Sequence, residues 1–305
     1  MNDARLGPAD FAAALGVVII WGLNFVAMKL ALRDFTPFQL GVARYVFAIV
    51  PLIFLVARPR LPWWWMLAGG LGQLGHFAFL FLALRDGMTA AMASVLMQTQ
   101  LFFTTLLGVF LLGERLKSPG GYSLALAAAG LACFALSALQ GSAGGDFTVA
   151  GLSLNLAAAF MWAVSNIIAR RAQQSHPDFD ALQYVVWMSL VPTLPFMLLS
   201  WQFDPPDSRW RWLEAGAVSW AAVAYLGWLA TIAAYAMWTW LLKRHAASRV
   251  SPFSLGTPVV GLAAGMWLLD ESVGLLQWIG SGLVIAALVL VMAWDRVRQA
   301  RAPRS

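Results

Sequence analysis

Ten continuous apolar segments, most of them about 20 residues long, run through this chain of 305 residues. A helix needs about 20 consecutive apolar residues to span a membrane, whereas the strands of a membrane barrel alternate apolar and polar residues over about ten positions. The segments therefore predict an all-α integral membrane protein with ten transmembrane helices. Their bounds are residues 11–32, 38–56, 63–84, 89–112, 119–139, 149–169, 181–201, 216–242, 250–269 and 273–294.

The scarcity of charged residues excludes a soluble fold and a disordered chain. Apolar residues make up 61% of the sequence and charged residues 11%, whereas soluble domains carry about 25% charged residues. The single cysteine, Cys133, lies in an apolar segment and excludes an intrachain disulfide. We expect a small buried side chain there, no metal site and no other cofactor.

The distribution of basic residues predicts the orientation of the chain. A net charge of +6 would suggest a nucleic-acid partner for a soluble protein, but in a membrane protein the basic residues mark the cytoplasmic side. If both termini are cytoplasmic, fourteen of the 20 Lys and Arg lie inside, five lie outside and Arg44 lies within a span. We therefore predict a multi-pass protein of the inner (plasma) membrane with cytoplasmic termini. Its partners are lipid and a small-molecule substrate, with no nucleic acid.

Two pairs of similar segments indicate an internal repeat. "WGLNFVAMK" at 21–29 resembles "WAVSNIIAR" at 162–170, and "LLGER" at 111–115 resembles "LLDES" at 268–272. The sequence thus predicts two five-helix repeats, residues 11–139 and 149–294. Because five is odd, the second repeat enters the membrane from the opposite side. Inverted repeats with a substrate site near the midplane are common in secondary transporters.

Polar side chains within predicted spans are the candidates for a substrate site, because such groups are costly in a bilayer. His76 is the one strong candidate for a titratable group at depth, although a neutral histidine bonded to another helix fits as well. Asn24 and Asn166 lie in the two repeat copies, where an amide could bind the ammonium and carboxylate groups of an amino acid or join two helices. Arg44 could pair with a substrate carboxylate, but we favour snorkelling to the headgroups.

The fourth and ninth predicted spans hold further candidates. Gln98 and Gln100 point about 200° from each other on a helix. One is therefore expected to line the pathway and the other to form a hydrogen bond with a neighbouring helix. Pro258 has no N–H, so within a helix the carbonyl of Ser254 loses its hydrogen-bond partner. This carbonyl, Ser254 and Thr257 could form a polar patch. The alternative is a proline kink with a purely mechanical purpose. Four aromatic residues could wall a pocket or simply pack: Trp162, Tyr225, Tyr235 and Trp238.

The repeats and four segments resemble the EamA branch of the drug/metabolite transporter superfamily, and within it the O-acetylserine/cysteine exporter type. The segments are "WGLNFVAMK", "FAFLFLAL" at 77–84, "LLGERL" at 111–116 and "VSPFSLGTPVVGLAAG" at 250–265. The resemblance covers residues 11–294. It implies an inner-membrane exporter of cysteine-pathway metabolites or other amino acids, with no ATPase. His76 departs from the glutamine that this type implies.

Two other function classes remain as alternatives. A broad-specificity amino acid, drug or lipid translocase would share the fold. A membrane enzyme would need a clustered catalytic set, but the three histidines fall in separate regions, and neither H-E-x-x-H nor G-x-S-x-G occurs. No G-x-x-x-x-G-K-[ST] loop is present to bind ATP. We predict a secondary transporter that works by alternating access and could form a homodimer.

Overall fold

The computed structural model describes residues 7–112, 120–140, 148–176, 178, 180–245 and 250–301. Every regular element in these ranges is a helix, which confirms the predicted all-α class. Eight segments are long and apolar enough to cross a membrane, and Phe253–Leu268 and Leu275–Leu290 are two shorter apolar helices. Together these segments overlap the ten predicted spans one for one. Residues 113–115 of the "LLGER" motif and residue 119, where the fifth predicted span begins, lie outside the described residues.

Several spans are built from more than one element, a subdivision that the apolar pattern did not predict. The first half of the chain contains α1 (Pro8–Ala31), α2 (Pro37–Ile49), η1 (Leu52–Phe54), α3 (Trp63–Arg85), α4 (Ala90–Leu96), η2 (Met97–Thr99), α5 (Gln100–Leu112) and α6 (Gly120–Leu139). The second half contains α7 (Val149–Ser175), α8 (Ala181–Met188), α9 (Leu190–Phe203), η3 (Arg211–Glu214), α10 (Ala217–Ala224), η4 (Tyr225–Ala233), α11 (Ala234–Arg244), η5 (Ser251–Leu255), α13 (Gly256–Leu268) and α14 (Leu275–Arg301).

Polar residues explain where four of the helices begin. The hydroxyl of Thr36 accepts a hydrogen bond from the backbone N–H of Gln39, and the Gln39 side chain accepts one from the backbone N–H of Thr36. This capping box satisfies N–H groups that have no partner inside the helix. Thr89, Thr148 and Asp180 accept backbone N–H groups at the starts of α4, α7 and α8.

Pro258 lies next to a change of helix type in the ninth span. The 3₁₀ turn η5 ends at Leu255, and Pro258 is the third residue of α13. The backbone stays helical across the junction, since Leu255 and Gly256 both have right-handed helical dihedral angles. Because proline has no N–H, the carbonyl of Ser254 receives no hydrogen bond from position 258. The polar patch of Ser254, Thr257 and this carbonyl stays a prediction.

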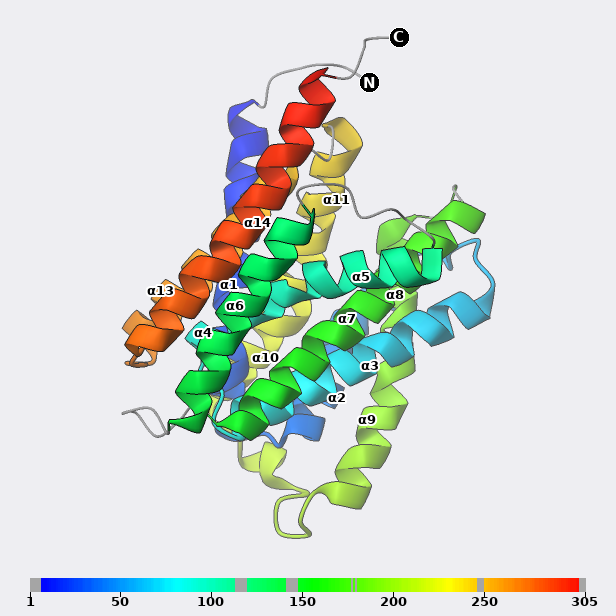
Figure 1. Ribbon diagram of the computed structural model, residues 1–305. Coiled ribbons are helices and arrows are strands. Elements are labelled where there is room, and N and C mark those ends of the chain that lie inside the picture. The colour runs from blue at the N-terminus through cyan, green and yellow to red at the C-terminus, as the bar shows by residue number, and fades with distance from the viewer. Residues whose placement is uncertain are drawn as a thin grey trace.

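The two halves of the chain run through the bundle in opposite directions. In Figure 1, α1 begins and α14 ends at the same end of the molecule, whereas α7 begins at the opposite end. We call the end that holds Pro8 and Arg301 the inner end and the opposite end the outer end. An even number of spans accounts for both termini of the described helices lying at one end.

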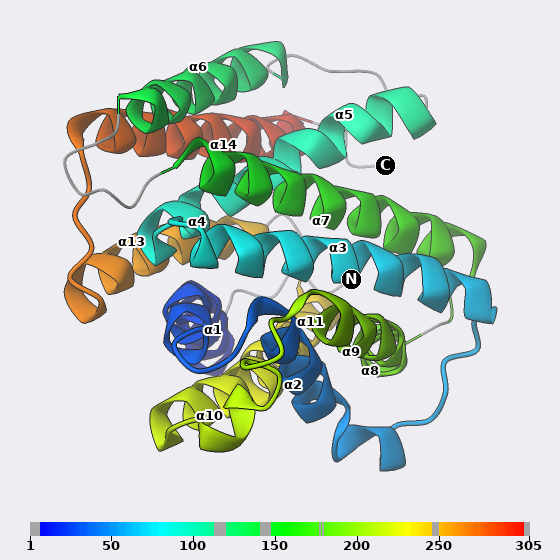
Figure 2. The same cartoon turned by 90° about the horizontal axis from the view of Figure 1, so that it is seen from below.

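The pairing of helices follows the order of the two halves. Helix α3 packs along α7, and α1 packs along α10, η4 and α11, so the third span contacts the sixth as the first contacts the eighth. Helix α4 contacts α13, α6 contacts α14 and α2 contacts α9, which pairs each of these spans with its counterpart five spans later (Figure 2). Two halves related by a two-fold axis would produce this pattern.

Small residues allow the first, fourth and ninth spans to approach closely. A side chain at Gly261 would overlap Ser94 of α4, and one at Gly22 would overlap Val260 of α13. Gly265, one turn after Gly261, faces the backbone of α4 in the same way. The GxxxG spacing in the ninth span is therefore used for contact with α4, as such spacings are in membrane helices.

We expect Gly261→Leu to destabilise the protein, because overpacking a close contact costs about 1–3 kcal/mol. The matched control is Gly282→Leu on α14, where an added Cβ atom would meet no atom within 4 Å. Thermal unfolding of the detergent-solubilised proteins should show a lower midpoint for Gly261→Leu and a nearly unchanged one for Gly282→Leu. Equal midpoints for the two variants would contradict the assigned contact.

Candidate functional site

Arg44 turns into the bundle instead of snorkelling to the headgroups. Its side chain is 5% exposed, about 10 Å along α2 from the outer end of that helix. Its Nη1 donates to Asn24 Oδ1 at 3.2 Å and its Nη2 to Thr231 Oγ1 at 3.2 Å. The guanidinium carbon lies 4.1 Å from the centre of the Phe77 ring, a cation–π distance. The favoured prediction for Arg44 was therefore wrong.

A stretch of π-helix places Thr231 within reach of Arg44. Segment η4 has the wide π turn, in which the Thr231 hydroxyl donates to the carbonyl of Leu226, five residues earlier, at 2.8 Å. The Nε1 of Trp21 donates to the carbonyl of Ala230 at 3.1 Å. Isolated π turns inside α-helices are frequent at functional sites.

His76 bonds to a neighbouring helix. Its Nδ1 lies 3.1 Å from the carbonyl oxygen of Ala158 on α7, and its side chain is 5% exposed. Because a carbonyl only accepts, Nδ1 carries the hydrogen of this bond. The rings of Phe77 and Trp162 flank the imidazole, with centroids 4.3 and 5.1 Å away. This geometry is the helix-joining alternative that the sequence had left open.

Gln100 is the glutamine that forms a hydrogen bond with a neighbouring helix. Its Oε1 accepts from Asn166 Nδ2 at 2.8 Å, its backbone carbonyl accepts from Thr104 Oγ1 at 2.7 Å, and its side chain is buried. Gln98 lies on η2 and is half-buried. The amides of the two repeats therefore have different partners, since Asn24 accepts from the second span and Asn166 donates to the fourth.

These residues form one set in the interior, because ring contacts join the two hydrogen-bonded groups. Phe77 under Arg44 is the sequence neighbour of His76, and Trp162 beside His76 is one helical turn from Asn166. We call the polar residues of this set the central cluster, namely Asn24, Arg44, His76, Gln100, Asn166 and Thr231.

The remaining predicted residues lie around the ninth and eighth spans. Thr257 is buried, and its hydroxyl has no hydrogen-bond partner among the described residues, whereas Ser254 is half-buried. Tyr235 and Trp238 pack on Trp21, with ring centroids 5.7 and 5.4 Å apart. The ring of Trp21 thus meets the eighth span, as the ring of Trp162 in the other repeat meets the third.

Sequence reasoning missed four interior residues. Tyr45 is 3% exposed, and its hydroxyl has no hydrogen-bond partner among the described residues. Asn155 on α7 is fully buried, and neither its amide nitrogen nor its amide oxygen has a hydrogen-bond partner among the described residues. The rarity of amides within spans, which singled out Asn166, would have found Asn155. Thr231 and Trp21 carried no comparable signal, because isolated threonine and tryptophan residues are common in membrane helices.

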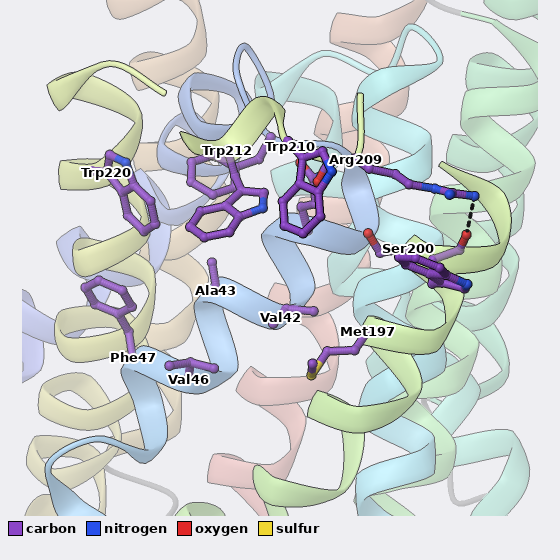
Figure 3. A pocket seen from close by; sticks show the side chains of 13 residues that line it. Val42, Ala43, Val46, Phe47, Met197, Ser200, Arg209, Trp210, Trp212 and Trp220 are labelled. Atoms are coloured by element: carbon purple, nitrogen blue, oxygen red, sulfur yellow. Dashed lines mark hydrogen bonds between the residues drawn. The ribbon is translucent and has the colours of Figure 1, made fainter. Parts of the chain in front are cut away.

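A groove of about 440 Å³ lies on the other side of α2 (Figure 3). Val42, Ala43 and Val46 point toward it from α2, and Trp210 and Trp212 lie across it. Arg44 is about 200° around the helix from Val42, so it faces away. None of the predicted site residues lines this groove, whose lining is Phe35, Gln39, Val42, Ala43, Val46, Phe47, Met197, Ser200, Trp201, Arg209, Trp210, Trp212 and Trp220.

Charged contacts hold the inner end together. Asp10 near the start of α1 lies 3.0 Å from His245 Nε2 and 3.5 Å from Arg244 Nε. These contacts join the first helix to the end of the eighth span. Arg244 also covers the ring of Trp240, 4.7 Å from its centre.

Carboxylates also hold the outer end together, mainly by accepting hydrogen bonds. Asp34 accepts from the backbone N–H of Gly216 at 2.9 Å and from the Ser219 hydroxyl at 2.8 Å. These two bonds lower the pKa of Asp34 below its usual value of 3.8. Asp204 accepts from the Thr36 hydroxyl at 2.6 Å.

Glu271, in the loop before α14, holds the outer end in the same manner. It accepts the N–H groups of Ala90 and Ala91 at 2.7 and 2.8 Å, so it caps α4 instead of only facing solvent.

The comparisons with known proteins agree on a family of transporters. Residues 10–136 and residues 149–293 each match the EamA-like transporter family. A protein of Salmonella typhimurium named "Probable amino-acid metabolite efflux pump" is 39% identical over 95% of this chain and 97% of its own length. A protein of the same name from Escherichia coli is 37% identical over the same shares.

Two more distant matches extend this result. A "Probable terminal-alkyne amino-acid exporter" of Streptantibioticus cattleyicolor is 27% identical over 98% of this chain and 99% of its own. A crystal structure with 20% identity superposes with a TM-score of 0.61 over 96% of this chain and 99% of its own, which supports the fold alone.

The contacts of Asp34 predict a pH-dependent stability. A carboxylate with a lowered pKa stabilises the fold above its unfolded pKa of about 3.9, and this contribution is lost as the pH falls through the folded pKa. We expect the unfolding temperature to fall less between pH 5 and pH 3 in Asp34→Asn than in the unmodified protein. Glu214→Gln, at an exposed carboxylate of η3 at the outer end, is the control and should retain the unmodified slope. An unchanged slope in Asp34→Asn would contradict the assignment.

Proposed function

Because this chain belongs to the EamA-like transporter family, we propose that it exports small amino-acid metabolites as a secondary transporter. The relatives named as amino-acid metabolite efflux pumps match it over nearly their whole length. The observation that carries the proposal is the central cluster, a set of hydrogen-bonding side chains in the interior of an apolar bundle. Such residues mark substrate pathways in membrane proteins. The relatives are named as transporters, and we propose no catalytic activity.

The interrupted fourth and ninth spans support a substrate site in the interior. Segment η2 separates α4 from α5, η5 precedes α13, and α4 packs against α13. The hydroxyl of Ser94 on α4 donates to the carbonyl of Ala91 at 2.7 Å and lies 3.3 Å from the carbonyl oxygen of Pro258 on α13. Discontinuous helices that meet near the midplane supply backbone groups for polar substrates in secondary transporters.

Alternating access is the mechanism that fits the burial of this site. Arg44, His76 and Gln100 are all buried, so a substrate reaches them only when part of the bundle opens. The inner contacts of Asp10 and the outer contacts of Asp34 both join the first span to the eighth, but at opposite ends, so one set can break while the other holds. The pairing of corresponding helices supports rocking of the two halves around the site.

We propose the inner membrane as the location, with the inner end facing the cytoplasm. The start of α1 and the end of α14 share this end (Figure 1), which supports placing both termini on one side. The bias of basic residues supports the cytoplasmic side.

For the substrate we propose cysteine-pathway metabolites such as O-acetylserine and cysteine. Their ammonium and carboxylate groups suit the amides and the cation of the central cluster. The second candidate is a broad translocase of amino acids, drugs or lipids. The groove of aromatic and aliphatic side chains on the outer part of α2 favours that alternative, since it offers apolar contact and few polar groups.

Export assays separate these candidates. We expect cells that overproduce the protein to release several-fold more O-acetylserine and cysteine than cells with an empty vector, and to resist toxic analogues of these compounds. Extracellular metabolites would be measured by mass spectrometry, with phenylalanine as the comparison substrate. Equal release of phenylalanine would favour the broad translocase, and unchanged release of every compound would contradict the proposed export.

We expect His76→Gln to retain the export rate and its pH dependence. The glutamine amide can donate to the carbonyl of Ala158, as the Nδ1 of His76 does. His76→Leu removes that donor and should lower the unfolding temperature, which makes it the comparison for a lost helix contact. A flattened pH profile for export by His76→Gln would contradict this interpretation and would assign proton coupling to the imidazole.

A further inference from the structure

Arg44 is a buried cation without an anionic partner among the described residues. Arg85 lies 2.7 Å from Asp86, and Arg244 and His245 lie 3.5 and 3.0 Å from Asp10, but no such carboxylate contact involves Arg44 among the described residues. Every described acidic side chain lies in a loop or near a helix end, namely Asp10, Asp34, Asp86, Asp178, Asp180, Asp204, Asp207, Glu214, Asp270 and Glu271. The positive charge of Arg44 is therefore not balanced by the part of the protein that the structure describes.

The groups around Arg44 satisfy its donors only in part. Asn24 offers an amide oxygen, and the hydroxyl hydrogen of Thr231 is already given to the carbonyl of Leu226, so that hydroxyl accepts from Arg44. Both acceptors are neutral. The Nε of Arg44 is buried and has no hydrogen-bond partner among the described residues. Burying a charge without an opposite charge is costly, and a structural tie between helices does not require a cation.

We propose that Arg44 binds the carboxylate of the transported molecule. The inference rests on the proposed export of amino-acid metabolites and names the group of the substrate that the site recognises. The planar guanidinium presents paired N–H donors that match the two oxygens of a carboxylate. The unpaired Nε supplies one of these donors, and Asn24 and Thr231 hold the fork in place from the first and eighth spans.

A carboxylate at this position also changes the energetics of the bundle. When a substrate binds, its negative charge balances the buried cation, so the occupied interior is more stable than the empty one. The site then discriminates strongly against analogues without a carboxylate, because they leave the buried donors unpaired. Acids and zwitterions therefore bind more tightly than the methyl esters of the same amino acids.

The first experiment compares ligands on the purified full-length protein. Thermal unfolding in detergent is followed with L-cysteine, O-acetylserine and L-phenylalanine, and with the methyl esters of cysteine and phenylalanine. We expect at least one free acid to stabilise the protein with an apparent affinity at least tenfold above that of its ester. Equal stabilisation by acid and ester overturns the proposal, and so does the absence of stabilisation by any acid.

The second experiment uses variants that separate charge, geometry and folding. Arg44→Met should lose the preference for acids over esters, and Arg44→Lys should retain part of it, because the charge remains but the fork is lost. Asn24→Asp places a carboxylate beside the guanidinium. We expect this variant to unfold at a higher temperature than the unmodified protein and to bind acids at least tenfold more weakly. Arg85→Met, at an exposed outer arginine, is the control for loss of positive charge.

A purely structural role for Arg44 predicts a different result. Asn24→Asp would then keep the acid affinity of the unmodified protein, and this outcome overturns the proposal even if Arg44→Met fails to fold. Failure of the proposed function is distinct, since it appears as acid binding that depends on Arg44 without export from cells. Export with no difference between acid and ester would instead leave the proposed function standing and contradict the role of Arg44.

Discussion

The architecture depends on satisfying hydrogen-bonding groups where water does not reach. The two terminal nitrogens of Arg44 on the second span donate hydrogen bonds to Asn24 on the first span and to Thr231 on the eighth. An unmet donor in a hydrocarbon environment costs several kcal/mol, so these bonds restrict how the three helices can lie. The π-helical segment η4 contributes to these bonds. It places the Thr231 hydroxyl where it accepts from the guanidinium and donates to the carbonyl of Leu226.

Two kinds of contact hold the bundle together, one in its interior and one at its ends. Small residues such as Gly22 and Gly261 bring the first, fourth and ninth spans into close packing that leaves no room for a side chain. At the ends, carboxylates hold helices together through bonds such as that of Asp34 to Ser219. Contacts of this second kind lie near water, where charged interactions are weak. The interior therefore depends on close packing between helices, and the ends depend on hydrogen bonds to carboxylates.

Much of the central cluster was predictable from the sequence, and the errors of the prediction have physical causes. Asn24, His76, Gln100 and Asn166 were predicted because amides and imidazoles are rare in apolar spans, and each has an interior hydrogen-bond partner. Arg44 was assigned to the headgroups because a long stem near a helix end can bend either way. Its direction depends on acceptors from other spans, which the pattern within one span does not report.

By itself, the sequence determined the positions of the ten apolar spans, because the bilayer sets the length and polarity of each segment separately. Only the tertiary structure decided which polar residues meet. Gln100 rather than Gln98 contacts Asn166, and Arg44 contacts Thr231, 187 positions away in the chain. In an apolar medium the contacts between helices depend on shape and on a few hydrogen bonds. A hydropathy pattern reports neither the shapes nor the hydrogen bonds, because both depend on which helix packs against which.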